Sequence, residues 1–307
     1  MRLLVFFIAL IFTLSVKAQY FPVYSQYMLN GLVINPAYAG SRDVLSTSLS
    51  YRKQWVGFEA VPITETFSAH MPLRNKSIAL GVLLINDKIG INNNLSLFTN
   101  YAYRIRMTNN GMLALGLKAG FSYLKDDLSK ITVREQNDYV FTNSSTGYFQ
   151  PNAGFGLYYY NPKFFTGVSI PTLLSYKRTD DGLGYKPINN VKNYNILLSG
   201  GAIFQLADNV KIKPSTLVQM QLNSTVQYDL NCNLIFLKDG QLWIGGSYRV
   251  KDAIVGLVEF QINTELRIGY SYDFTLSELN KYSYGSHEIM IRYEFKYIVK
   301  ALTPRFF

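Results

Sequence analysis

Apolar and polar side chains alternate along many segments of about ten residues, and this period of two constrains the fold more than any other feature. In residues 288–297 the odd positions are all Ile, Tyr or Phe, and the even positions are Glu, Met, Arg, Glu and Lys. Residues 265–274 repeat the pattern with the opposite parity, and 211–222 and 95–106 follow it less cleanly. Successive side chains of a strand point to opposite faces of a sheet, so the pattern predicts strands with one apolar and one polar face.

The first 18 residues are typical of a cleaved signal peptide. Arg2 supplies the positive start, residues 3–16 form an apolar run, and Val16-Lys17-Ala18 places small residues around a cleavage site. The run is shorter than the ~20 residues that a membrane helix needs, and no later stretch is long enough either. We therefore expect export, cleavage after Ala18, and a mature chain without a membrane helix.

Composition agrees with an exported β protein. Charged residues are 16% of the chain and aromatic residues 15%, whereas soluble domains carry roughly 25% charged residues. The single Cys232 excludes an internal disulfide. Loss of Arg2 and Lys17 with the signal lowers the formal charge of +10 by two. The chain stays basic but has no Lys/Arg cluster of the kind that follows nucleic acid, so no nucleic-acid partner is expected.

Fourteen segments carry the strand pattern, and most approach the ~9–11 residues that cross a bilayer at a tilt. An even number is usual for a single-chain bacterial barrel. The segments lie at 44–53, 62–72, 76–87, 94–106, 112–124, 152–161, 164–171, 193–206, 209–222, 225–237, 241–250, 253–262, 264–274 and 287–297.

The connections between these segments sort by length. Counted from the first, the even-numbered connections are short and rich in Asn, Asp and Gly, which suit tight turns. The odd-numbered ones include every long loop, at 54–61, 88–93, 125–151, 171–192 and 275–286. Short turns at one end and long loops at the other are the asymmetry of an outer-membrane barrel, whereas a soluble sandwich has no reason to sort its loops by parity.

Closure of the sheet is the physical basis of the fold prediction. In hydrocarbon every backbone donor and acceptor must be paired within the protein, and a closed sheet achieves this without a sticky edge. The apolar face then meets lipid, and polar side chains such as Arg104, Lys118, Asp273 and Arg292 face the lumen. We predict an all-β protein whose residues 44–297 form a transmembrane antiparallel β-barrel of about 14 strands. It would lie in the cell outer membrane with short turns and both termini periplasmic, and with a tail at 298–307.

Aromatic residues near strand ends are expected to form girdles at the two membrane interfaces. Core packing in a soluble β protein is the alternative explanation for them. Examples are Tyr101, Tyr103, Tyr158, Tyr159, Tyr160 and Tyr297.

Signals for catalysis or metal binding are weak. His70 and His287 are the only histidines, so a His-rich metal site is excluded. Ser68 and His70 share one face of a strand, and a membrane hydrolase could use such groups, but two lumen-facing polar side chains explain them more simply. The pairs at 126–127 and 180–181 are both Asp-Asp, without the alternating ligand spacing of a calcium loop. We predict no enzyme activity, no cofactor and no metal.

Residues 19–43 precede the first strand and are too apolar and aromatic for a free tail. Asn35-Pro36 and Gly40 break any regular element there. We expect this plug-like segment to pack inside the barrel or against its periplasmic rim. Its candidate residues are Tyr27, Asn35, Pro36, Tyr38 and Gly40.

Aromatic and basic residues at strand ends and in long loops are candidate partner contacts. Trp55 and Phe58 follow the first strand and can serve either as girdle residues or as contacts for a partner. Tyr176, Arg178 and Tyr185 lie in the loop 171–192 and are the other candidates.

Several ordered motifs run the length of the mature chain. They are 24–41 with its Ile-Asn-Pro-Ala-Tyr-Ala-Gly core at 34–40, 51–57 with Gln54, 66–73, 85–90, 149–156, 269–273 and 304–307. On these motifs the chain resembles the PorP/SprF family of type IX secretion proteins of Bacteroidetes. It departs from the family pattern at Tyr20-Phe21-Pro22-Val23, where an Asp-Pro pair would be expected.

The resemblance implies an outer-membrane barrel that works with the secretion and gliding apparatus. SprF-like members look like dedicated partners of one large secreted protein, often an adhesin, whereas PorP-like members join the machinery that links the outer membrane to ring proteins at the peptidoglycan. We expect a non-enzymatic component that partners the export or surface anchoring of a secreted protein. Its partners would be the C-terminal domain of that cargo, the type IX secretion machinery and outer-membrane lipid. A channel or hydrophobic-solute transporter is the alternative.

Overall fold

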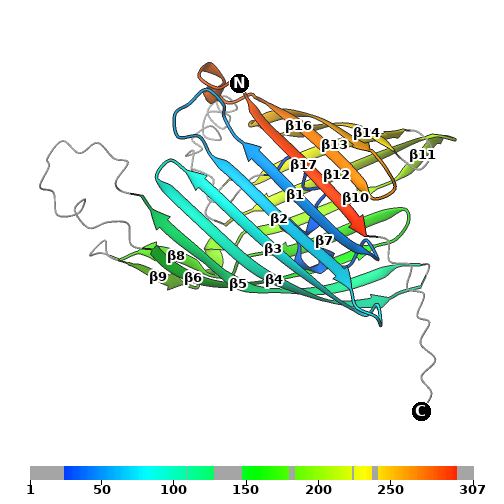
Figure 1. Ribbon diagram of the computed structural model, residues 1–307, viewed down its shortest axis with the longest axis horizontal. Coiled ribbons are helices and arrows are strands. Elements are labelled where there is room, and N and C mark those ends of the chain that lie inside the picture. The colour runs from blue at the N-terminus through cyan, green and yellow to red at the C-terminus, as the bar shows by residue number, and fades with distance from the viewer. Residues whose placement is uncertain are drawn as a thin grey trace, which may run out of the picture.

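A computed structural model describes residues 24–108, 110–127, 147–179, 184–222, 225–236 and 241–295. Within them one antiparallel sheet runs in sequence order and closes on itself, because β10 pairs with both β7 and β12 (Figure 1). The strands are β1 (Leu45–Lys53), β2 (Ile63–Pro72), β3 (Ile78–Ile89), β4 (Asn92–Arg106), β5 (Met112–Asp126), β6 (Gly147–Tyr160), β7 (Phe164–Ile170), β10 (Ile196–Ala202), β11 (Phe204–Ala207), β12 (Val210–Met220), β13 (Gln227–Phe236), β14 (Leu242–Arg249), β15 (Ala253–Gln261), β16 (Leu266–Thr275) and β17 (Ser286–Phe295).

β10 and β11 are two halves of one barrel strand. Both pair with β12, and the register is the same before and after the break at Ile203. The break falls opposite Lys213 and Pro214, and a proline has no N–H to donate to the ladder. The barrel therefore has fourteen strands, and the predicted all-β, 14-stranded antiparallel barrel is confirmed.

The alternation of side chains is the alternation of the two barrel faces. In β17 the even positions Glu288 and Met290 are each 2% exposed, whereas Ile289 and Ile291 on the odd positions are 48% and 42% exposed. β15 alternates in the same way, with Glu259 inside and Phe260 outside. The polar face thus surrounds the lumen and the apolar face lies on the outer wall, as the sequence pattern predicts.

The connections define a long-loop end and a short-turn end of the barrel. Between described strands, the long loops span 54–62, 127–146, 171–195 and 276–285, all at one end. The loop at 171–195 contains a hairpin of β8 (Ser175–Arg178) and β9 (Tyr185–Ile188). The prediction of a long loop at 88–93 is wrong. β3 and β4 extend to a two-residue turn, in which Gly90 takes φ +60°.

Two of the tyrosines expected in the aromatic girdles lie on the outer wall and two do not, and the girdles themselves stay a prediction. Tyr101 and Tyr103 are 40% and 46% exposed on the outside of β4. Tyr158 and Tyr160 instead face the lumen, where Tyr158 packs against Ala37 and Ala114. Their even positions in β6 share the parity of the inward-facing Gly154 and Gly156, so alternation rather than nearness to a strand end decides their direction. Tyr297 lies outside the described residues.

Residues 24–44, here called the luminal segment, run through the inside of the barrel (Figure 1, dark blue). They form two 3₁₀ turns, η1 (Gly31–Val33) and η2 (Pro36–Tyr38), each a single turn. Tyr24 lies in the long-loop half of the lumen beside Thr66, and Asp43 reaches Arg104 near the short-turn end. The predicted signal peptide 1–18 and the tail 298–307 lie outside the described residues. Among those that are described, no helix has the length and apolarity to span a bilayer.

Candidate functional site: the plugged lumen and the long-loop end

Asn35 fixes the middle of the luminal segment to the barrel wall. Its side-chain oxygen accepts a hydrogen bond of 2.9 Å from the N–H of Ala37 and so caps η2, whose first residue is Pro36. Its Nδ2 donates to the carbonyl of Leu157 on β6 at 2.9 Å. Ser169 on β7 donates in turn to the carbonyl of Ile34. Ile34 and Asn35 therefore join the turn to two neighbouring strands.

Small residues on the inner wall allow the luminal segment to approach the strands closely. A Cβ built on Gly116 of β5 would lie 2.1 Å from the backbone nitrogen of Ala37, and one on Gly156 would lie 2.2 Å from Asn35 Oδ1. Ala79 and Ala102 are fully buried against Leu32 and Ala39. Packing of this kind leaves no room for larger side chains at these wall positions.

His70 and Ser68 bind the luminal segment separately. The Gly40 N–H donates to His70 Nδ1 at 3.1 Å, and Tyr38 packs its ring edge-on against the imidazole, with centroids 5.5 Å apart. Gly40 takes φ +75°, and a Cβ there would lie 2.4 Å from Ala79, so only glycine fits. Ser68 donates to Asn30 Oδ1 at 3.2 Å. The two residues that could have formed a hydrolytic pair are thus lumen-facing and occupied by the luminal segment.

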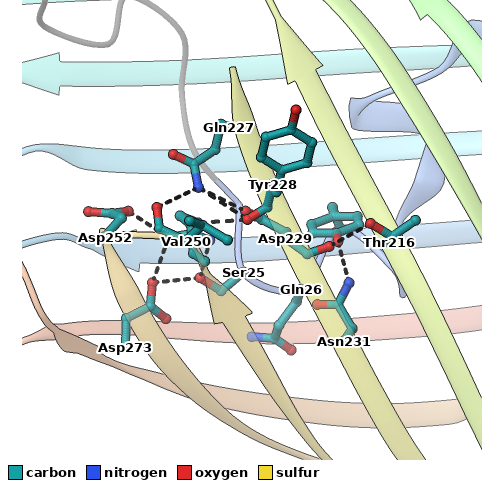
Figure 2. Close-up of polar contacts among 12 residues, drawn as sticks. Ser25, Gln26, Thr216, Gln227, Tyr228, Asp229, Asn231, Val250, Asp252 and Asp273 are labelled. Carbon is teal, nitrogen blue, oxygen red and sulfur yellow. Dashed lines mark hydrogen bonds and ion pairs between the residues drawn. The ribbon is translucent and has the colours of Figure 1, made fainter. Parts of the chain in front are cut away.

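A buried cluster of charges holds the start of the luminal segment. Asp273 of β16 accepts from Ser25 Oγ at 2.7 Å, as Figure 2 shows, and forms an ion pair of 2.8 Å with Arg52 of β1. Glu288 of β17 accepts from the Ser25 N–H at 2.8 Å and pairs with Arg52 at 3.2 Å. Arg249 of β14 joins Asp273 to Asp229 of β13. Each of these charged side chains has a counter-charge, as buried ions require.

Further ion pairs follow the luminal segment toward the short-turn end. Arg292 donates to the carbonyl of Leu29 at 2.7 Å and pairs with the fully buried Glu259 at 3.1 Å. Arg42 of the segment pairs with Glu294 of β17 at 2.7 Å. The segment is therefore bound by charge-assisted hydrogen bonds along its length, which are stronger than neutral ones.

Tyr27 is buried at the centre of the lumen. Its hydroxyl accepts a hydrogen bond from Asn231 Nδ2 on β13, and its ring packs against Leu197 and Leu217. Burial raises the pKa of the Tyr27 hydroxyl well above its usual value, because the charged form would lose its hydration. Tyr27 is thus a neutral aromatic contact between the segment and the wall.

The long loops at 54–62 and 276–285 hydrogen bond to one another at the long-loop end of the barrel. The N–H of Val56 donates to the carbonyl of Gly285, and the N–H of Tyr284 donates back to the carbonyl of Val56. Trp55, with φ +52°, donates its N–H to Ser286 Oγ at 3.1 Å. The ring of Phe58 faces that of Tyr282 at 6.3 Å.

The exposed part of this pairing is aromatic. Phe58, Tyr282 and Tyr284 are 37%, 69% and 76% exposed, and we call these three residues the aromatic knob. Trp55 is only half-exposed and belongs to its base. Gln54 follows β1 directly and closes the same loop through its N–H, which donates to the carbonyl of Pro62.

The other candidate contacts lie in the β8–β9 hairpin. The hydroxyl of Tyr176 donates to the carbonyl of Pro151, and Tyr185 packs its ring at 5.0 Å from that of Tyr148. Arg178 stands opposite Tyr185 in the hairpin register. The hairpin and the aromatic knob both lie at the long-loop end of the barrel (Figure 1).

The charge cluster as a unit is not predicted by the sequence. Asp273 is among the residues predicted to face the lumen, whereas its partners Arg52 and Arg249 and the segment residue Ser25 are not. The available signal was parity, because Arg52 alternates with exposed Leu49 and Tyr51 in β1. The pairing of these inward-facing charges depends on the register between strands and on the position of the luminal segment. Neither can be predicted from a single strand.

No group of three or more His, Cys, Asp and Glu side chains in the described ranges is arranged to hold a metal ion. Asp126 is the last residue of β5, the N–H of Asp127 donates to the carbonyl of Ile91, and residues 180–181 lie outside those ranges. The arrangement holds a segment in place and presents loops on one side.

The fold and its filled lumen define a class of protein, a plugged β-barrel of the outer-membrane type. A sequence model of the family described as "type IX secretion system membrane protein PorP/SprF" matches residues 16–293, nearly the whole chain. The chain belongs to the PorP/SprF family, and it is an outer-membrane component of the type IX secretion system. No curated protein matches it in sequence.

Solved structures with a similar fold are outer-membrane barrels. The Ralstonia pickettii toluene transporter TbuX aligns with a TM-score of 0.53 at 10% identity, over 87% of this chain and 93% of that one. The P. putida toluene transporter TodX aligns at 0.49 and 9% identity, over 87% and 94%. The Acinetobacter baumannii outer membrane protein Omp33 aligns at 0.47 and 8% identity, over 82% and 99%. At this identity the likeness to TbuX concerns the fold alone.

Proposed function

We propose that this barrel partners the export or surface anchoring of a secreted protein, without enzymatic activity and without acting as an open pore. The observation that carries the proposal is the luminal segment, which hydrogen bonds and ion pairs tie to the wall from Ser25 to Asp43. A lumen filled in this way leaves the loops as the surface on which a partner can bind.

The aromatic knob and the β8–β9 hairpin are the proposed contacts for the cargo's C-terminal domain. Exposed aromatic side chains are common anchors of protein interfaces. The knob is held by two loops that hydrogen bond to one another, so little ordering is required when a partner binds. In this proposal Trp55 supports Phe58, and Tyr176, Arg178 and Tyr185 form the second part of the surface.

The long-loop end faces the cell exterior in this proposal, as the loop asymmetry favours. β17 then ends on the periplasmic side, which supports a periplasmic C-terminus. A periplasmic N-terminus stays a prediction: residues 1–23 lie outside the described ranges, and Tyr24 lies in the long-loop half of the lumen. The type IX secretion machinery would be met from the short turns.

The test is a deletion strain complemented with loop variants. Loss of the gene should remove one secreted protein from the surface while permeability to small dyes stays unchanged. The double variant Phe58→Ser, Tyr282→Ser should assemble but not restore that protein. The matched control Leu73→Ser, Met107→Ser changes two exposed apolar residues at the short-turn end and should restore it. Normal surface proteomes in the deletion strain would refute the proposal.

A channel or hydrophobic-solute transporter is the second candidate, because a cavity with a partly apolar wall remains in the lumen beside Tyr27 and Phe98. Steady conductance of the purified protein in planar bilayers would favour it. Silence would favour the plugged partner.

A further inference from the structure

A cavity of about 180 Å³ lies in the lumen on the long-loop side of the luminal segment. Its apolar wall includes Tyr27, Phe98, Leu197 and Leu217. Residues 171, 172 and 174–176 of the long loop also line it. A space of this order holds one aromatic ring or a short aliphatic chain.

Lys118 is a buried cation on the wall of this cavity. It is only 6% exposed, and its Nζ lies 3.9 Å from the centre of the Phe98 ring. No carboxylate lies within ion-pair distance of it in the described part of the chain, although Arg52, Arg249 and Arg292 in the same lumen are all paired. A cation–π contact offsets only part of the cost of burying an ammonium group.

Buried amide atoms beside the same cavity also lack partners among the described residues. Within those ranges Gln150 Nε2, Asn94 Oδ1 and Asn195 Oδ1 have no hydrogen bond, and all three residues line the cavity. Buried polar atoms are nearly always paired, so several unpaired ones around a cavity indicate a missing partner. Gln150 offers a donor for an anionic oxygen, and the two asparagine oxygens offer acceptors for an N–H.

We propose that this cavity binds a small carboxylate with an apolar body. The carboxylate would pair with Lys118 and accept from Gln150, and the apolar body would lie among Phe98, Leu197 and Leu217. The ligand has two possible sources with the same chemistry, a free organic acid or the C-terminal residue of a peptide, whose amide N–H would meet Asn94 or Asn195. The site goes beyond the proposed partner role and does not depend on it.

The test is calorimetric binding to the purified full-length barrel in detergent. Phenylacetate and phenylacetamide compare acid with neutral amide, and acetyl-Gly-Phe and its C-terminal amide repeat the comparison for a peptide end. Binding of an acid but not of its amide is expected. Lys118→Met should weaken acid binding about tenfold or more, the usual effect of losing a charged hydrogen bond, and Lys118→Arg should restore part of it.

Lys213→Met is the matched control. Lys213 is also a buried lysine, with its Nζ 5.0 Å from the Trp243 ring centre, but it lines a different cavity. Its replacement should leave acid binding unchanged. If Lys118→Met does not fold, Phe98→Leu tests the same wall and should weaken binding of the acid. Absence of binding by both acids, equal binding of acid and amide, or an equal loss in Lys213→Met would overturn the proposal.

Discussion

At the residue scale, the glycines of the inner wall decide whether the luminal segment fits. Gly116 faces inward and would place a Cβ 2.1 Å from a backbone atom of the segment, which cannot move as a side-chain tip can. Gly256 lies on an outward position of β15 with nothing within 4 Å of its Cβ. The sequence assigns both glycines to strands, and the alternation of side chains gives the face on which each lies. It does not reveal that the backbone of Ala37 packs against Gly116.

Gly116→Ala is therefore expected to displace the luminal segment and to destabilise the barrel by about 1–3 kcal/mol, as overpacking of a dense interior does. Unfolding by guanidinium in detergent micelles measures this. Gly256→Ala is the control and should unfold at the same denaturant concentration as the wild type or a slightly higher one, because alanine loses less conformational freedom than glycine in a strand. Equal midpoints for all three proteins would show that the segment does not rest on Gly116.

A second prediction at this scale concerns Arg52. Its replacement by Met leaves Glu288 without its arginine partner, whereas Asp273 keeps Arg249. Breaking a buried ion pair from one side costs about 3–5 kcal/mol. Removing the second charge as well, in Arg52→Met, Glu288→Gln, should recover much of that loss in the same unfolding measurement. A double variant no more stable than Arg52→Met would contradict this reading of the cluster.

At the scale of elements, the strands and the luminal segment differ in how far sequence predicts them. The fourteen strands could be predicted because each carries its own alternation, and each pairs with its neighbours in sequence. The interruption at Ile203 could not be predicted, because its place opposite Lys213 and Pro214 is visible only once β12 is paired with it. The turns η1 and η2 have no periodicity of their own, and their position follows from the side chains that hold them. Asn35-Pro36 indicated a break in regular structure but not the strands to which it binds.

Removal of the luminal segment tests what it does for the barrel. Replacement of residues 25–41 by a Gly/Ser linker should convert a silent barrel into an ion-conducting one, because the polar inner face would then surround water. Single-channel recording in planar bilayers measures this. A deletion protein that folds and remains silent would show that the lumen is closed by something other than this segment.

At the scale of the whole molecule, every long loop lies at one end, and the proposed partner surface depends on which side of the membrane that end occupies. The charge pattern does not decide this, whereas loop length does, because long loops are typical of the extracellular side of such barrels. The chain offers a direct measurement, since Lys177 in β8 and Lys163 in the turn after β6 are both exposed and lie at opposite ends. Its single Cys232 can be removed by Cys232→Ser to give a background without thiols.

In that background, Lys177→Cys should react with a membrane-impermeant maleimide on intact cells, and Lys163→Cys should react only after the outer membrane is opened. The unmutated protein is a separate control for bilayer burial, because its Cys232 is exposed on the outer wall in the middle of β13 and should be shielded by lipid. The opposite labelling order would place the aromatic knob and the β8–β9 hairpin in the periplasm. These two surfaces would then bind the exported protein on the periplasmic side, and the short turn at Lys163 would face the cell exterior.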